Sequence, residues 1–152
     1  MNAFAGVILE DEFGRILLQL RDNIPRIANP NQWGLFGGRI ETGEIPFEAA
    51  LREIEEELCI KLSPDRLHPF TIYRDSPEQC FYRFHYQVTA GEIAAIRLTE
   101  GQRYGLWSQA EIATGELEGY AVTALTRRSL TDFFNHRATS DSSIEFKNKD
   151  EN

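Results

Sequence analysis

Cysteine and long apolar runs are scarce in this sequence of 152 residues. Cys59 and Cys80 are its two cysteines and form no C-x-x-C pair, so neither a cysteine-based zinc site nor a disulfide framework is indicated. No stretch approaches the roughly 18 consecutive apolar residues that a membrane-spanning helix needs. Residues 1–10 lack the basic segment and the small-residue cleavage site of a signal peptide. We therefore expect a cytoplasmic protein with no membrane partner.

Basic residues are also in short supply. Sixteen Lys and Arg stand against 24 Asp and Glu, which gives a net charge of −8. Such a balance repels the phosphate backbones of DNA and RNA, so a nucleic-acid polymer is not an expected partner. The negative charge is concentrated, because residues 41–57 hold seven Glu and one Arg, a net charge of −6. Such an acidic block is most often a solvated helix face or a disordered tail. The residues around it decide whether it forms a functional site instead.

The length fits one domain, and the sequence pattern predicts both strands and helices. Residues 3–10 and 15–20 are apolar runs joined by Asp-Glu-Phe-Gly, which predicts a β-hairpin. A helix is expected from Pro46 to Leu58, because apolar residues recur there at helical spacing and proline suits a first helical position. Residues 33–40 are predicted to form a short apolar strand that contains Gly37-Gly38, where backbone can approach a ligand closely.

The rest of the chain predicts a mixed sheet covered by helices on both faces, which is an α/β fold. Further strands are expected at 66–74, 80–90, 93–98 and 103–107, and further helices at 108–112 and 122–134. We place the single domain at residues 3–136 and a polar C-terminal tail at 137–152.

Three glutamates share one face of the expected helix. Glu53, Glu56 and Glu57 stand at positions i, i+3 and i+4, where like charges repel and weaken a helix by a few tenths of a kcal/mol per pair. A divalent cation would compensate for this repulsion, since Mg²⁺ takes oxygen ligands and is commonly shared between carboxylates and substrate phosphates. The alternative is a solvated acidic face neutralised by Arg52 and bulk cations.

The residues around this face carry a motif. Gly38 is followed after five residues by Glu44 and after seven more by Arg52-Glu53-Ile54-Glu55-Glu56-Glu57-Leu58-Cys59-Ile60. This resembles the Nudix box, G-x5-E-x7-R-E-U-x-E-E-x-G-U with U a bulky aliphatic residue, at eight of its nine specified positions. The resemblance implies the Nudix fold, an α/β/α sandwich, over residues 3–136.

Two positions depart from the family pattern. Cys59 replaces the glycine that follows the helix, and a left-handed cap at a residue with a Cβ costs roughly 1 kcal/mol. Phe36 stands where many members have proline, which bears on the loop that presents the Gly37 carbonyl.

The resemblance also implies roles. It implies hydrolysis of a nucleoside diphosphate linked to another moiety, by water attacking phosphorus, with Mg²⁺ or Mn²⁺ as cofactor. The implied metal ligands are the three glutamates and the Gly37 carbonyl: Glu53, Glu56, Glu57 and Gly37. Arg52 and Glu44 are implied to orient the glutamates, and the general base is either Glu53 or the later loop residue Glu100.

The substrate is less defined than the reaction. Aromatic candidates for stacking on a base include Trp33 and Phe36, and Arg21 and Arg39 are candidates for contacts to phosphate or ribose. Nucleoside triphosphates, nucleotide sugars and ADP-ribose-like molecules all remain open as the small-molecule partner, and homodimers are frequent among such families. The alternative function is a non-catalytic Nudix-fold sensor of a nucleotide; retention of all three box carboxylates favours the enzyme.

Overall fold

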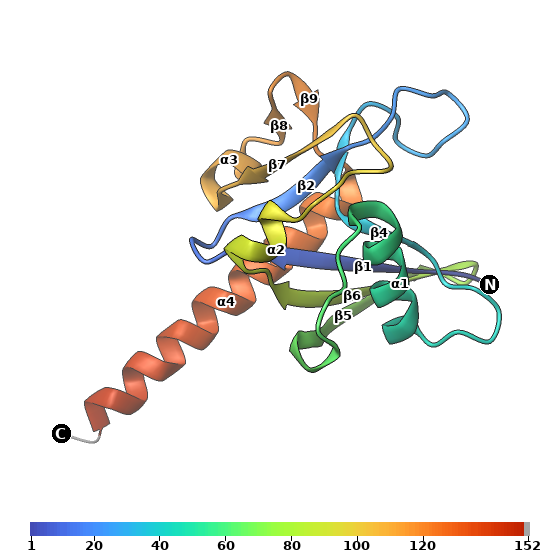
Figure 1. The fold of residues 1–152 in the computed structure, drawn as a ribbon. Helices are drawn as coiled ribbons and strands as arrows, with labels where there is room; N and C mark the ends of the chain where they lie inside the picture. Colours follow the sequence, from blue (N-terminus) through green and yellow to red (C-terminus); the bar gives the residue numbers. More distant parts are fainter. Residues whose placement is uncertain (151–152) are drawn as a thin grey trace.

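The computed structural model describes the backbone of residues 1–150 and the side chains of residues 1–140. Four strands precede the first helix, and the remaining strands are distributed between the later helices up to the long C-terminal helix (Figure 1). The main strands are β1 (Asn2–Glu10), β2 (Ile16–Leu20), β3 (Trp33–Gly34), β4 (Phe36–Arg39), β5 (Leu67–Ser76), β6 (Gln79–Gln87) and β7 (Arg103–Trp107). The helices are α1 (Pro46–Leu58), the 3-10 turn η1 (Pro64–Arg66), α2 (Ala90–Ala94), α3 (Gln109–Ala113) and α4 (Ala124–Asp150).

The seven main strands form one mixed sheet with β1 at its centre. β1 runs parallel to β6 on one side and antiparallel to both β2 and β4 on the other. β3 and β7 each pair antiparallel with β2, and β5 pairs antiparallel with β6. A separate two-stranded ribbon consists of β8 (Glu116–Leu117) and β9 (Tyr120–Ala121).

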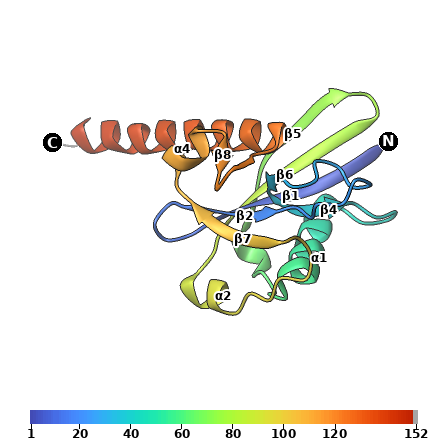
Figure 2. The same ribbon diagram turned by 90° about the horizontal axis from the view of Figure 1, so that it is seen from above.

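Both faces of the sheet are buried under helices. Along β1, Val7 and Leu9 belong to the core shared with α1, whereas Ile8 belongs to the core shared with α4. This follows from the alternation of side chains along a strand. Figure 2 shows the layers, with α4 on one side of the sheet and α1 and α2 on the other. The predicted α/β/α sandwich is confirmed.

Several predicted elements have the expected place. The helix over residues 46–58 is α1, and the hairpin is β1–β2 with Gly14 at a φ of 77° in its turn. α4 begins near the predicted position but continues to Asp150, because neither glycine nor proline occurs between 124 and 150 to end it. The domain boundary at 136 stays a prediction, and residues 151 and 152 of the predicted tail lie outside the described residues.

The predicted strand at 93–98 is wrong. Residues Ala90–Ala94 form α2 instead, and a capping box starts it: the Thr89 hydroxyl accepts from the Glu92 N–H at 3.1 Å, and the Glu92 carboxylate accepts from the Thr89 N–H at 2.9 Å. This reciprocal pair satisfies two N–H groups at the start of the helix and outweighs the apolar run that suggested a strand. Within residues 1–150, no helix is long and apolar enough to cross a bilayer.

Candidate metal and hydrolase site

Helix α1 displays the carboxylates at the edge of the sheet where β4 lies. Pro46 occupies its first turn, and its apolar side packs on the sheet through Ala50, Ile54 and Leu58. Helical spacing then puts Glu57 at the border of the buried side, where only 2% of its surface is exposed. The helix is thereby fixed to the core while its acidic face meets β4.

Two glycines in β4 allow α1 and β1 to approach this closely. A Cβ on Gly38 would lie 2.5 Å from Cδ of Glu53, so the carboxylate occupies the space that any side chain would need. Gly37 has a φ of 149°, and its Cβ would lie 2.1 Å from the carbonyl oxygen of Ala5 in β1. The Gly37-Gly38 pair therefore brings the backbone and the Glu53 carboxylate together.

Glu57 is the most perturbed carboxyl group of the site. Burial first, and then the negative charges of Glu53 and Glu100, raise the pKa of Glu57 to about 9, although a backbone hydrogen bond from Gly37 lowers it. Its Oε2 atom is buried and has no hydrogen-bond partner among the described residues. Burial also raises the pKa of Glu53, against the lowering effect of Arg52. Glu53 and Glu57 therefore lack a positive charge that would balance both carboxylates.

Arg52 joins the acidic residues into a network. Its Nε and Nη2 donate to the two carboxylate oxygens of Glu44 at 2.7 and 2.9 Å, and Nη2 also donates to the Arg39 carbonyl at 3.0 Å. Nη1 donates to Glu53 at 2.9 Å and to Glu56 at 3.3 Å. The hydrogen bonds from Arg52 lower the pKa of Glu44 to about 2. Arg52 therefore fixes the direction of Glu53 while Glu44 fixes Arg52.

Glu56 is separated from its two neighbours. Its side chain is 57% exposed and lies against Arg52, whereas Glu53 and Glu57 turn toward β4. Among the residues with described side chains, no three His, Cys, Asp or Glu groups form a ready metal-binding cluster. The structure thus brings two of the three predicted carboxylates together and leaves Glu56 at the rim.

Glu100 belongs to the same site although it is far away in sequence. It lies in the loop between α2 and β7, is exposed, and its charge acts on Glu57. The sequence placed Glu100 in a later loop but did not predict the neighbouring contacts that hold this loop to α1. The threonine before Glu100 and the glycine after it are local sequence signals of a turn that is anchored by hydrogen bonds.

The predicted aromatic contacts to substrate need correction. Trp33 and Phe36 have no exposed surface. The Trp33 ring lies in the core beneath α4, where its indole N–H donates to the Leu117 carbonyl at 2.8 Å, and Phe36 lies in the core beneath α1. Because neither ring has a free face in this structure, neither can stack on a base.

The two predicted arginines lie at the surface. The exposed Arg39 donates to the Asn2 side chain and borders an open hollow of about 600 Å³ with Glu41 and Thr42. Arg21 is half-buried, and its Nε donates to the Ala28 carbonyl at 2.8 Å. Arg39 thus lies beside the network of Arg52, whereas Arg21 supports its own loop.

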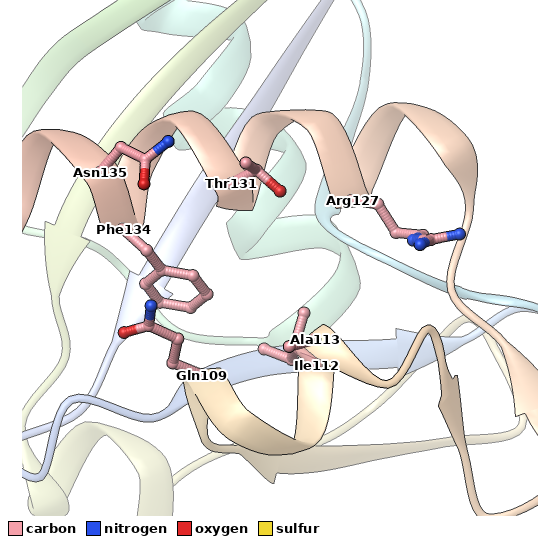
Figure 3. Close-up of a pocket in the computed structure, with 7 residues that line it drawn as sticks. All are labelled: Gln109, Ile112, Ala113, Arg127, Thr131, Phe134 and Asn135. Carbon is pink, nitrogen blue, oxygen red and sulfur yellow. The ribbon is translucent and has the colours of Figure 1, made fainter.

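A second cavity is remote from this chemistry. It has a volume of about 260 Å³ and lies between α3 and α4 (Figure 3), on the α4 side of the sheet. Ile112, Ala113 and Phe134 line it together with polar groups including Arg127. None of the predicted site residues lines it.

Cys59 ends α1 in the manner of the glycine that it replaces. It has φ 58° and ψ 30°, the left-handed conformation, and its N–H donates to the Glu55 carbonyl at 3.0 Å. The carboxylates are therefore followed by an ordinary helix cap despite the substitution, at the steric cost of a Cβ in that region.

Comparison with known proteins supports the interpretation of the motif. Nucleoside triphosphatase NudI from Escherichia fergusonii is 35% identical over 68 residues, which are 45% of this chain and 47% of that protein. The chain thus spans about half the length of the first of these relatives. A NudI protein from Escherichia coli is 27% identical over 134 residues, covering 81% of this chain and 89% of that protein.

Solved structures share the fold. A mutT/nudix family protein from Listeria innocua superposes with a TM-score of 0.71 at 19% identity, covering 94% of this chain and 96% of that chain. The family model for the NUDIX domain matches residues 2–128, which include the whole motif and the sheet that supports it. The chain therefore belongs to the NUDIX domain family.

Proposed function

We propose that the protein hydrolyses a phosphoanhydride bond in a nucleoside diphosphate linked to another moiety, with Mg²⁺ or Mn²⁺. The observation that carries this proposal is the buried Glu57 carboxylate, which lies beside Glu53 and has an oxygen without a hydrogen-bond partner among residues 1–140. Two carboxyl groups held together at the edge of a sheet destabilise one another unless a cation or a proton neutralises them. Family membership supports the same conclusion.

The residues present fit a divalent cation. Mg²⁺ takes oxygen ligands, keeps several waters and is often held by one or two protein carboxylates together with substrate phosphates. Glu53 and Glu57 would hold the cation, and the Gly37 carbonyl and the Glu56 carboxylate would complete the set. When bound, the cation neutralises the diphosphate and makes phosphorus more electrophilic.

The remaining residues have two tasks: Arg52 and Glu44 orient Glu53, and Glu100 accepts a proton. Arg52 holds Glu53 at 2.9 Å, and Glu44 holds Arg52 through two hydrogen bonds. The Glu53 carboxylate is therefore occupied by its bond from Arg52. Glu100, in contrast, is exposed, and its side chain has no hydrogen bond or ion pair within residues 1–140. We assign the general base to Glu100: it accepts a proton from water, the water oxygen bonds to phosphorus, and the bridging P–O bond breaks with its electron pair passing to the departing phosphate.

Nucleoside triphosphates are our first choice of substrate. The support comes from the relatives, two of which are named nucleoside triphosphatases. Arg39 borders the open hollow next to the network and would meet the phosphate chain. A homodimer and a cytoplasmic location stay predictions.

A substrate panel tests the proposal. Nucleoside triphosphates, nucleotide sugars and ADP-ribose are incubated with the protein and Mg²⁺, and the products are separated by chromatography. We expect turnover of at least one class, its loss on chelation of the cation, and its return when Mg²⁺ is added back. Tight nucleotide binding without turnover of any class would overturn the proposal and favour a nucleotide sensor.

A further inference from the structure

The loop that carries Glu100 is hydrogen-bonded to the end of α1. The last carbonyl groups of a helix have no partner within the helix. Here the Arg97 N–H donates to the Leu58 carbonyl at 2.9 Å, and the Thr99 N–H donates to the Glu57 carbonyl at 3.0 Å. The Thr99 hydroxyl donates to the Glu56 carbonyl at 2.6 Å. Residue 99 thus closes the final turn of the helix that bears the acidic residues.

The other side of Glu100 is also fixed. The Gly101 N–H donates to the Asp22 carboxylate at 3.3 Å, and the Gln102 N–H donates to the Leu20 carbonyl at 2.8 Å. The Gln102 side chain donates to Asn31 at 2.8 Å. Gly101 has a φ of 85°, a conformation that favours glycine. Glu100 therefore lies between two anchored residues, one held to α1 and the other to β2 and its following loop.

Glu100 itself is held only through its backbone neighbours. Its side chain has no hydrogen bond or ion pair within residues 1–140, yet its charge acts on the buried Glu57. Such a carboxylate needs its main chain fixed if it is to meet a reacting group at one distance, since small displacements of a catalytic group are costly. At the residue before Glu100, the side-chain contact that joins the loop to α1 is the Thr99 hydroxyl, which acts beside the Thr99 N–H.

We propose that Thr99 is a positioning residue: its hydroxyl, bonded to the Glu56 carbonyl, sets the place of Glu100 relative to the Glu53–Glu57 pair. This inference rests on the proposed function. The hydroxyl adds a side-chain bond to the two main-chain bonds that the Arg97 and Thr99 N–H groups make to α1, and it does so at the residue next to Glu100. Removing the hydroxyl loosens this attachment while leaving the two main-chain bonds and all of the acidic residues in place.

Three variants test the role of the hydroxyl. Thr99→Val keeps the shape and the main-chain N–H but removes the hydroxyl, and Thr99→Ser restores it. Thr114→Val is the matched control, because the Thr114 hydroxyl donates to the Glu111 carbonyl at 2.7 Å at the end of the distant helix α3. We expect Thr99→Val to lower kcat about 10-fold with KM within about 2-fold, Thr99→Ser to restore kcat, and Thr114→Val to leave both constants unchanged.

Thermal unfolding separates positioning from general damage. Each valine variant loses a hydroxyl that contacts two carbonyl oxygens, those of Glu56 and Glu57 for Thr99 and those of Glu111 and Glu116 for Thr114. The two variants should therefore lower the melting temperature by similar amounts, about 3 °C. The loss of kcat should nevertheless occur in Thr99→Val alone. An equal loss of kcat in both variants, or no loss in Thr99→Val, would overturn the inference.

A double-mutant cycle with Glu100→Gln tests whether Thr99 acts through Glu100. Glu100→Gln alone should lower kcat about 100-fold or more. In that background Thr99→Val should have an effect below about 2-fold, because the group that it positions is no longer a base. A 10-fold loss in both backgrounds would show that Thr99 acts on α1 directly. That result would contradict the inference and would leave the proposed hydrolase function unaffected.

Two further outcomes separate the inference from the proposed function. If Glu100→Gln is fully active, the inference and the general-base assignment are both wrong. If the wild type turns over no substrate, the proposed function fails too.

Discussion

Replacing Glu57 by Gln should change how the stability of the metal-free protein depends on pH. The pKa of Glu57 is about 9 in the folded protein against an ordinary value of 4.5. Between these values the folded state keeps the proton and the unfolded state loses it, so the unfolding free energy falls as pH rises. The slope is about 1.4 kcal/mol per pH unit, or roughly 2.7 kcal/mol between pH 6 and pH 8. Gln has the same shape and no proton to lose, so this slope disappears in the variant.

Urea unfolding at a series of pH values measures this difference. Both proteins share every other titrating group, so subtracting one curve from the other isolates Glu57. We expect Glu57→Gln to gain on the wild type steadily from pH 6 to pH 8, with equal m-values. Addition of Mg²⁺ at pH 8 should then stabilise the wild type, because the cation binds the ionised carboxylate, and should stabilise the variant much less. Parallel curves without metal would refute the reasoning that burial holds a proton on Glu57.

Three further changes have expected outcomes. Cys59→Gly should raise the melting temperature by about 1–2 °C, because it removes a left-handed strain of roughly 1 kcal/mol and the added chain entropy of glycine cancels only part of this gain; calorimetry that shows no rise would contradict this. Gly38→Ala should lower kcat at least about 10-fold in the substrate assay, because its Cβ would lie 2.5 Å from the Glu53 carboxyl carbon; unchanged kcat would show that Glu53 has room to move. Arg52→Lys should lower kcat about 10-fold with the fold retained by circular dichroism, since lysine cannot make the forked contact to Glu44; full activity would mean that the network is not needed to orient Glu53.

The sequence predicted the local parts of the site well. Helix α1 has its predicted bounds because proline, apolar spacing and the end of the apolar stripe all agree. The motif also predicted that Arg52 and Glu44 orient the glutamates, and Arg52 donates to both Glu44 and Glu53. Long-range packing was less accessible. Trp33 lies close to Gly37 and Gly38 in sequence, but its side chain points to the other face of the sheet, into the core beneath α4.

Two features depended on contacts between distant segments. Glu56 shares its helix face with Glu53, yet Arg52 holds it at the rim, and helical spacing alone does not distinguish a rim residue from an inner one. Glu100 reaches the site because the loop before β7 satisfies the carbonyl groups at the end of α1. That pairing joins residues more than forty positions apart, and no periodicity in the sequence encodes it.

The central claim is that a divalent cation held by the Glu53–Glu57 pair supports hydrolysis of a nucleotide. It is tested most directly by comparing the wild type and Glu57→Gln on the best substrate of the panel, with Mg²⁺ varied and products resolved by chromatography. We expect cation-dependent turnover by the wild type and a loss of kcat of about 100-fold or more in the variant, which remains folded. Equal turnover by the two proteins, at every cation concentration, would contradict it.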